Sequence, residues 1–263
     1  MESAFEAIAV VQAKMSFFEP SSDVSRINRA QAGDFVEVSL LTYKVLETAN
    51  RFHRDSGGLF DITIAPELQR WGCLPELECT PNRRRSRSCQ SDLELVAGSL
   101  VRVKRPVRID LGGIAKGFAV DEGIKAMKQC GGIAGTVNAG GDLRSFGPHP
   151  LPIQVRHPQM PGNLLPLTEL QDEALATSAI YFSRARWRRQ WISPLVNGRN
   201  RTPCRASQSV SVLAPDCMTA DALTKIVMLD AEGCAPLLAA CNARAFIVTR
   251  HGEIFSTISP DAS

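Results

Sequence analysis

The sequence lacks the features of membrane-spanning, fibrous and disordered chains. It has no run of about 18 consecutive apolar residues, the length needed to cross a bilayer. Of its 263 residues only 6% are aromatic, and no long segment is both poor in apolar residues and of one charge sign. Since 44% are hydrophobic and Gly and Pro are used at ordinary levels, we expect a globular chain with a substantial core.

The sequence also lacks a metal-binding cysteine pattern and a secretory signal. Its eight cysteines form no C-x-x-C pair and no Cys/His zinc spacing, which argues against a zinc site and favours reduced cysteines. No basic segment followed by an apolar one comes after Met1. As written, the chain is expected to be cytoplasmic and without a membrane span; a start further upstream would allow a periplasmic location.

Acidic residues are missing between Glu173 and Asp216, although the whole chain has a net charge of only +3. This stretch suits an anionic ligand, a phosphate or an acidic partner, and a solvated Arg-rich loop is the alternative. No nucleic-acid partner is expected, because only Trp187 and Trp191 interleave with the arginines as residues that could stack on bases. The arginines of the stretch are Arg184, Arg186, Arg188, Arg189, Arg199, Arg201 and Arg205.

Hydrophobic periodicity predicts helices mixed with hairpin-connected strands, which is an α+β architecture without regular βαβ alternation. The expected helices cover residues 5–17, 40–53, 66–71, 114–130 and 219–229, with a further one ending near 241. The expected strands cover residues 34–38, 60–64, 100–103, 107–109, 134–138 and 210–213, followed by a terminal hairpin that turns at 251–252. Residues 80–91 are expected to form a polar surface loop.

Two glycine turns followed by charged residues are the first candidates for chemistry. In residues 110–117, DLGGIAKG, paired glycines precede a helix start, where backbone N–H groups and Lys116 could bind an anionic oxygen. The alternative is an ordinary helix start with a lysine that extends to solvent. Residues 138–142, NAGGD, repeat the pattern and end in a carboxylate, Asp142. Neither segment is a common nucleotide-binding motif.

A third candidate lies in the helix that begins near residue 219. Thr219 is expected to cap it, which places Asp221 in the first turn, where the helix dipole favours a carboxylate without any ligand. Asp221 and Thr224 also share one helix face and could hold Mg²⁺. Spacing assembles no Ser/His/Asp or Cys/His arrangement, so nucleophilic hydrolysis is a weak hypothesis.

Several blocks together resemble the ApbE-type FAD:protein FMN transferase family over nearly the whole chain. They are MSFFEPSSDVSRIN (15–28), GGLFDITIAPELQRWG (57–72), IDLGGIAKGFAVD (109–121), NAGGDLRSFG (138–147), ALATS (174–178) and APDCMTADAL (214–223). The resemblance implies a T-fold-like α+β fold that binds FAD with Mg²⁺ at its pyrophosphate. It also implies transfer of FMN to a Thr or Ser hydroxyl of a target protein, a redox-chain subunit or flavin-carrying domain, with release of AMP.

The same resemblance implies roles for individual residues. The positions that match FAD-contacting ones, or supply an apolar side chain to the pocket, are Met15, Phe60, Asp110, Lys116 and Leu195. The carbonyl of Gly113 and the carboxylate of Asp221 match metal ligands, with Thr224 as a further ligand. Asp221 and Asp142 are the candidates for a base that takes the acceptor's proton.

Three departures from the family pattern stand beside these matches. The family's opening strand with its Met-Gly-Thr-like motif is absent, so residues 1–263 are expected to be one family domain that lacks this strand or has a misassigned start. A His-Ile-x-Asp-Pro-x-Thr-Gly segment is replaced by PLVNGRNR at 194–201. Lys225 stands where the family has a metal-ligating Thr.

Lys225 leaves two hypotheses open. Its ammonium, together with the arginines of 184–205, could replace part of the metal's charge; alternatively it extends to solvent and Thr224 becomes the ligand. The function likewise keeps alternatives beside the transferase: a relative that only binds or hydrolyses FAD, and an Arg-rich module that docks an acidic or nucleic-acid partner.

Overall fold

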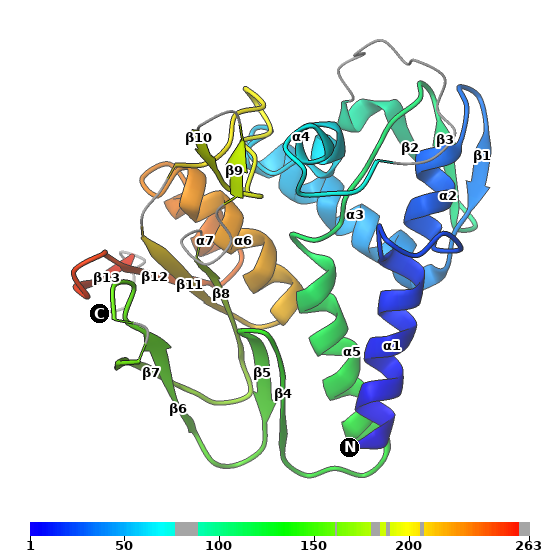
Figure 1. The fold of residues 1–263 in the computed structure, drawn as a ribbon. Coiled ribbons are helices and arrows are strands. Elements are labelled where there is room, and N and C mark those ends of the chain that lie inside the picture. Colours follow the sequence, from blue (N-terminus) through cyan, green and yellow to red (C-terminus); the bar gives the residue numbers. More distant parts are fainter. Residues whose placement is uncertain (77–88, 161, 180–184, 188–189, 206–207, 258–263) are drawn as a thin grey trace. The chain divides into compact units, whose positions relative to one another are not determined.

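The computed structural model describes residues 1–76, 89–160, 162–179, 185–187, 190–205 and 208–257, drawn as a ribbon in Figure 1. The chain divides into two compact units. Unit 1 comprises Met1–Val10, Gly113–Arg184 and Arg205–Ser263, and unit 2 comprises Val11–Gly112 and Ala185–Cys204. The expected polar loop at 80–91 lies mostly outside the described residues. No helix among those described is long and apolar enough to cross a membrane.

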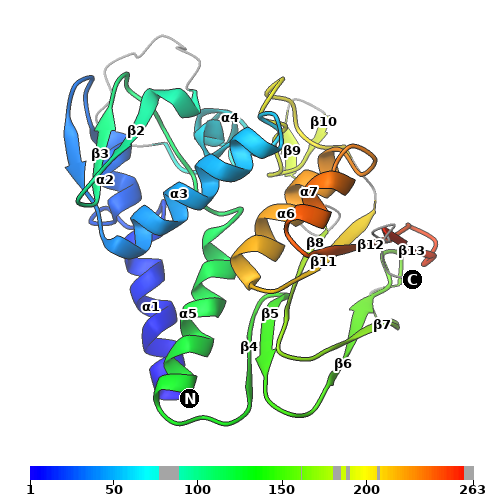
Figure 2. The same ribbon diagram turned by 180° about the vertical axis from the view of Figure 1, so that it is seen from behind.

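Unit 2 combines short helices with a small antiparallel sheet of order β1-β3-β2 and a separate hairpin of β9 and β10. Helix α3 packs on β2 and α2 on β1 (Figure 2). A cluster of Leu68, Trp71, Ile192 and Val196 forms part of the core. The helices are α1 (Glu2–Met15, shared with unit 1), α2 (Asp23–Arg29), α3 (Leu40–Asp55), α4 (Ala65–Arg70) and the 3₁₀ turns Ile62–Ile64 and Gln90–Asp92; the strands are β1 (Phe35–Glu37), β2 (Leu93–Val96), β3 (Leu100–Val103), β9 (Ala185–Trp187) and β10 (Gln190–Ile192).

The strand expected at residues 60–64 is wrong, because this segment begins a 3₁₀ helix, Ile62–Ile64. The Asp61 side chain accepts hydrogen bonds from the backbone N–H of Thr63 at 2.7 Å and from its hydroxyl at 2.6 Å. A short polar side chain that bonds to the backbone two residues ahead competes with sheet formation. These local hydrogen bonds therefore outweigh the β propensity of residues 60–64.

The strand expected at residues 107–109 is also absent. The Asn28 side chain accepts from the Ile109 N–H at 2.7 Å and donates to the Ile109 carbonyl at 3.0 Å. The next N–H, of Asp110, donates to the Ile62 carbonyl at 2.8 Å. A buried amide side chain therefore satisfies a backbone that a neighbouring strand would otherwise pair.

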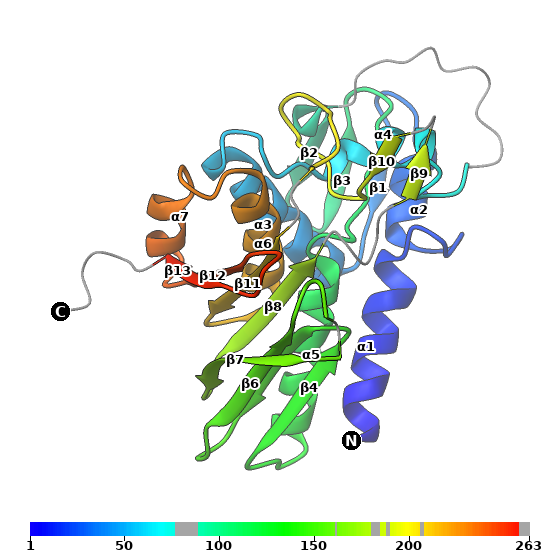
Figure 3. The same cartoon turned by 60° about the vertical axis from the view of Figure 1, so that its left-hand side comes forward.

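Unit 1 is built on an antiparallel sheet of order β13-β12-β11-β8-β5-β4, with a separate hairpin of β6 and β7. Helix α5 runs beside β4 and β5, α6 packs on β8 and β11, and α7 on β12 (Figures 1 and 3). Its helices are α5 (Ala115–Gln129), α6 (Cys217–Leu229) and α7 (Ala235–Ala240); its strands are β4 (Gly135–Ala139), β5 (Asp142–Phe146), β6 (Leu151–Arg156), β7 (Leu164–Leu170), β8 (Ala174–Ala179), β11 (Ser209–Ala214), β12 (Arg244–Val248) and β13 (Ile254–Thr257).

The sequence analysis did not predict β6 and β7, because they lie in a proline-rich segment. Pro has no backbone N–H to donate to a sheet, so such a segment is not typical of strands. They pair only with each other, so prolines are tolerated on their outer edges. The predicted helices at 114–130 and 219–229 and the terminal hairpin are confirmed. The mixture of helices and antiparallel sheets confirms the predicted α+β class.

Helices α5 and α6 approach each other closely at Gly117. A methyl group on its Cα would lie 2.2 Å from the Cys217 carbonyl oxygen and 2.8 Å from the Asp221 Cβ. Both distances are shorter than real Cβ contacts, so only glycine fits without a shift of the backbone. This contact sets the N-terminal turn of α5 directly against the side chains of α6.

Candidate functional site

Four charged side chains of unit 1 form the candidate site. Asp142 and Asp221 are buried, with 1% and 0% exposure, and each pairs with a lysine. Lys116 lies in the first turn of α5, Asp142 begins β5, and Asp221 and Lys225 lie on α6. The structure thus brings Lys116, Asp142 and Asp221, which the sequence analysis singled out as candidates, together with Lys225, for which it left two hypotheses open.

Lys116 and Asp142 form the first pair. The Lys116 ammonium donates to Asp142 Oδ2 at 2.5 Å, although half of the lysine side chain remains exposed. The lysine is therefore more than a solvent-directed residue at a helix start. Burial and the nearby Asp221 raise the pKa of Asp142, against the opposing effect of Lys225 and Lys116. The other oxygen, Asp142 Oδ1, is buried and has no hydrogen-bond partner among the described residues.

Burial acts to lower the pKa of Lys116, but the Asp221 and Asp142 carboxylates outweigh it, so its pKa lies above the usual value. Lys116 therefore stays positively charged at neutral pH. Two buried carboxylates hold a cation whose side chain still reaches the surface, an arrangement suited to an anionic ligand.

Asp221 and Lys225 form the second pair, one helical turn apart. The Lys225 ammonium donates to Asp221 Oδ1, and the Gly117 backbone N–H donates to Asp221 Oδ2 at 3.1 Å. Only 15% of the Lys225 side chain is exposed, so it does not extend to solvent as one sequence hypothesis held. Both carboxylate oxygens of Asp221 are occupied within the protein.

Thr224 faces away from the carboxylate of Asp221. Its fully buried hydroxyl donates to the backbone carbonyl of Asp221 at 2.7 Å and pairs with the Ser178 hydroxyl of β8 at 2.8 Å. These bonds tie α6 to the sheet. The hydroxyl that was expected to ligate Mg²⁺ beside Asp221 is thus hydrogen-bonded within the protein.

The start of α6 differs from the expectation that Thr219 caps it. Asp216 is the N-cap, and its carboxylate accepts from the Thr219 N–H at 2.8 Å and from the Thr219 hydroxyl at 2.9 Å. Asp121, on α5, accepts from the first two N–H groups of α6, those of Cys217 and Met218, at 2.9 Å each. With its first turn saturated, α6 offers no free N–H groups there to an anion.

Asp121 is a structural residue that the sequence analysis missed. It also accepts from Arg144 at 2.6 Å, which links α5, α6 and β5. Burial raises its pKa, and the two helix N–H groups oppose the rise. The spacing of DLGGIAKGFAVD gives no signal of this role, because the partners are about a hundred residues distant in sequence.

The other predicted residues belong to unit 2, apart from Gly113, which lies in the turn that leads into α5. Met15 and Phe60 are buried, and Phe60 packs edge-on against Phe52 at 6.1 Å between ring centroids. Leu195 is half-buried. Asp110 is half-buried as well; burial raises its pKa to about 6, while the Gly112 N–H acts to lower it.

Two arginines of the acid-free stretch are used inside unit 2. Arg199 donates to the carbonyls of Gly57 and Ser56 at 2.8 Å each. Arg201 donates to Asp61 at 2.8 Å and to the Thr63 carbonyl at 2.9 Å. These two therefore stabilise the loop around Phe60 instead of facing an external anion, and Arg184, Arg188 and Arg189 lie outside the described residues.

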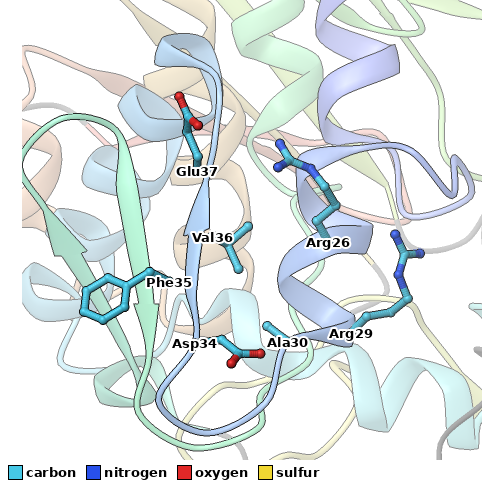
Figure 4. A pocket seen from close by; sticks show the side chains of 7 residues that line it. All are labelled: Arg26, Arg29, Ala30, Asp34, Phe35, Val36 and Glu37. Atoms are coloured by element: carbon cyan, nitrogen blue, oxygen red, sulfur yellow. The ribbon is translucent and has the colours of Figure 1, made fainter.

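A shallow groove of unit 2 between α2 and β1 contains none of the predicted site residues (Figure 4). Arg26 and Arg29 project from α2 on one side, and Asp34 and Glu37 lie on the other. Arg26 already pairs with Asp23. The mixed charges around the groove indicate no particular ligand.

The residues around Asp221 do not fit a divalent metal ion as they stand. The Lys225 ammonium already neutralises the Asp221 carboxylate, Oδ2 also accepts from the Gly117 N–H, and the Thr224 hydroxyl donates to a backbone carbonyl. Within the described part of the chain, no group of three or more His, Cys, Asp or Glu side chains could hold a metal. These residues therefore provide no basis for a reaction step that uses a metal ion at Asp221.

Comparison with known proteins finds relatives of similar sequence and fold. The FAD:protein FMN transferase of Haemophilus influenzae is 27% identical over 275 residues, covering 96% of this chain and 79% of that protein. The enzyme of the same name from Vibrio cholerae is 29% identical over 240 residues, covering 84% and 70%. The crystal structure of the ApbE protein of Thermotoga maritima superposes with a TM-score of 0.83 at 28% identity, covering 97% of this chain and 87% of that one.

An α+β chain with this likeness is an enzyme of the transferase class. The ApbE family model matches residues 1–247, and the chain belongs to the ApbE family. The apo structure of the Pseudomonas stutzeri flavinyl transferase ApbE, at 24% identity and a TM-score of 0.81, shares the same fold.

Proposed function

We propose that this chain is an FAD:protein FMN transferase. It cleaves the pyrophosphate of FAD, transfers FMN to a Thr or Ser hydroxyl of a target protein, and releases AMP. The observation that carries the proposal is the cluster of Lys116, Asp142, Asp221 and Lys225, in a chain whose relatives bear that activity in their names. The acceptor class, a redox-chain subunit or flavin-carrying domain, is part of the proposal.

The reaction is a phosphoryl transfer. The acceptor oxygen forms a bond to the phosphorus of the FMN half, the bond from that phosphorus to the bridging oxygen breaks, and the bridging oxygen leaves with AMP. Enzymes assist such a reaction mainly by positioning the groups and stabilising charge. Lys116 supplies a positive charge for the pyrophosphate oxygens, since its ammonium is held by buried carboxylates and its side chain remains half exposed.

The hydroxyl proton of the acceptor goes to Asp142 in this proposal. Both oxygens of Asp221 already accept hydrogen bonds, whereas Asp142 Oδ1 is buried without a partner. An unsatisfied buried oxygen gains a hydrogen bond when a hydroxyl approaches it, and the raised pKa of Asp142 favours proton uptake. Asp221 is then a positioning residue that orients Lys225 and the start of α5.

The sequence-based assignments in unit 2 remain part of the proposal. Met15, Phe60, Asp110 and Leu195 are proposed to contact FAD, and residues 1–263 are proposed to act as one family domain. Mg²⁺ was expected at Gly113, Asp221 and Thr224, but the bonds around Asp221 and Thr224 do not support a place for it. The proposal therefore does not require the ion.

Mass spectrometry tests the proposed reaction. The purified chain is incubated with FAD and a candidate acceptor domain, and FMN on the acceptor and AMP in solution are measured. We expect equal amounts of both products and no labelling when the acceptor Thr or Ser is replaced by Ala. The Asp142→Asn variant should lose about a hundredfold or more in transfer rate. Glu169→Gln, at an exposed position of β7, is the matched control and should keep the rate.

The second candidate function is binding or hydrolysis of FAD without modification of a protein. It is favoured by residues 194–201, where PLVNGRNR replaces the family's His-containing motif and Arg199 holds the loop at Gly57. Free FMN and AMP without a labelled acceptor would indicate hydrolysis. Intact FAD that co-purifies with the protein and yields no product would indicate a binding protein.

A further inference from the structure

The side chain of Lys225 occupies the position beside Asp221 that a cation would take. Lysine and aspartate are four residues apart on α6, the spacing at which helix side chains meet. The Asp221 side chain is fully buried and that of Lys225 is 15% exposed, so solvent screens this pair little. The ammonium is thus fixed at the carboxylate.

A second cation at Asp221 would lie directly beside the Lys225 ammonium. Oδ1 accepts from Lys225, Oδ2 accepts from the Gly117 N–H, and the Thr224 hydroxyl donates to a backbone carbonyl. A hard divalent ion needs about six oxygen ligands, and Mg²⁺ usually takes one or two of them from carboxylates. An ion bound here would be repelled by the neighbouring ammonium unless Lys225 moved away.

Charge balance leads to the same conclusion. Two carboxylates, Asp142 and Asp221, face two ammonium groups, Lys116 and Lys225, so the cluster is neutral without an added ion. Lys225 acts to lower the pKa of Asp142, and Asp221 acts to raise the pKa of Lys116, so the charges of the two pairs influence each other. Without FAD, a divalent ion would add two positive charges beside Lys225, which is largely buried.

We infer that the Lys225 ammonium takes the place of a divalent metal ion at Asp221 in this chain. The role of the ammonium in the reaction rests on the proposed function: if FAD is the substrate, Lys225 and Lys116 together neutralise its pyrophosphate. The arrangement of Lys225 itself is a property of the protein without FAD and can be tested without any transfer reaction.

Binding of Mn²⁺, followed by electron paramagnetic resonance, is the test. The full chain, free of flavin, is titrated with Mn²⁺, and the free ion is quantified for the wild type and for Lys225→Thr and Lys225→Met. Both substitutions remove the ammonium and free Asp221 Oδ1. The wild type should show no saturable site, whereas Lys225→Thr should bind one equivalent of Mn²⁺. Lys225→Met should gain less, because it supplies no oxygen.

Lys125→Thr is the matched control, since Lys125 pairs with Glu122 on the exposed face of α5. It should behave as the wild type does. Saturable Mn²⁺ binding by the wild type that Lys225→Thr does not improve would overturn the inference. The inference would also be overturned if neither Lys225 variant showed a saturable Mn²⁺ site although circular dichroism showed both to be folded. Absence of FMN transfer would contradict the proposed function alone and leave the binding result to decide the inference.

Discussion

The close contact of α5 and α6 at Gly117 predicts a large effect of a single methyl group. In Gly117→Ala the new Cβ would lie 2.2 Å from the Cys217 carbonyl oxygen, and distances below 3.0 Å essentially never occur for real Cβ atoms. The obstacle is backbone, so no side chain can rotate away. The helices must separate, and the hydrogen bond from the Gly117 N–H to Asp221, 3.1 Å long, lengthens with them.

The expected cost follows from two opposing effects. Overpacking of a tight core costs about 1 to 3 kcal/mol, and the backbone contact places this substitution at the upper end. Alanine is a better helix former than glycine by about 1 kcal/mol. The net loss is therefore about 2 kcal/mol of unfolding free energy, or about 0.7 M in the urea midpoint if the slope is about 3 kcal/mol/M.

Gly123→Ala on the same helix provides the control. A Cβ there would lie 3.4 Å from a Val137 methyl group and 3.5 Å from the Ile8 Cδ1, which are ordinary contacts with side-chain ends. This variant should be as stable as the wild type or more stable by up to about 1 kcal/mol. Equal urea midpoints for the two alanine variants would refute the argument that Gly117 is required by the approach of α6.

Three further substitutions test other parts of the structure by urea denaturation. Burial raises the pKa of Asp110 to about 6, so the unfolding free energy of the wild type should fall relative to that of Asp110→Asn as the pH rises from about 4 to about 6. The fall should be at most about 3 kcal/mol. A constant difference between the two proteins across this pH range would contradict the pKa shift. Asp121→Ala removes the acceptor for the first two N–H groups of α6 and should cost about 2 kcal/mol; an unchanged midpoint would contradict its capping role. Arg201→Leu leaves the buried Asp61 carboxylate without its partner and should cost about 3 kcal/mol, whereas a variant as stable as the wild type would show that the pair contributes nothing.

Much of the fold could be predicted because its elements are locally encoded. The apolar residues of α3, α5 and α6 recur with the helical period that the structure shows. The glycine pair marks the turn between β4 and β5. Residues 60–64 and 107–109 could not be predicted, since side chains of Asp61 and Asn28 take over backbone bonds there. The Asp61 bonds are local and the Asn28 bond joins residues far apart in sequence, but hydrophobic periodicity encodes neither.

The candidate site was predictable in part. Lys116, Asp142 and Asp221 stood out because glycine turns and a helix start place charges beside exposed backbone. The four-residue spacing of Asp221 and Lys225 also contained the signal for their ion pair, although the sequence analysis did not consider that pair. Asp121 was missed because its partners come from a distant helix.

The dependence of FMN transfer on Mg²⁺ tests most directly the claim that Lys225 replaces a metal ion in the reaction. The transfer rate to the acceptor domain is measured for the wild type and Lys225→Thr, first with a chelator and then with increasing Mg²⁺. We expect the wild type to keep its transfer rate in the presence of the chelator, and the transfer rate of Lys225→Thr to depend on Mg²⁺. The same Mg²⁺ requirement in both proteins would contradict it.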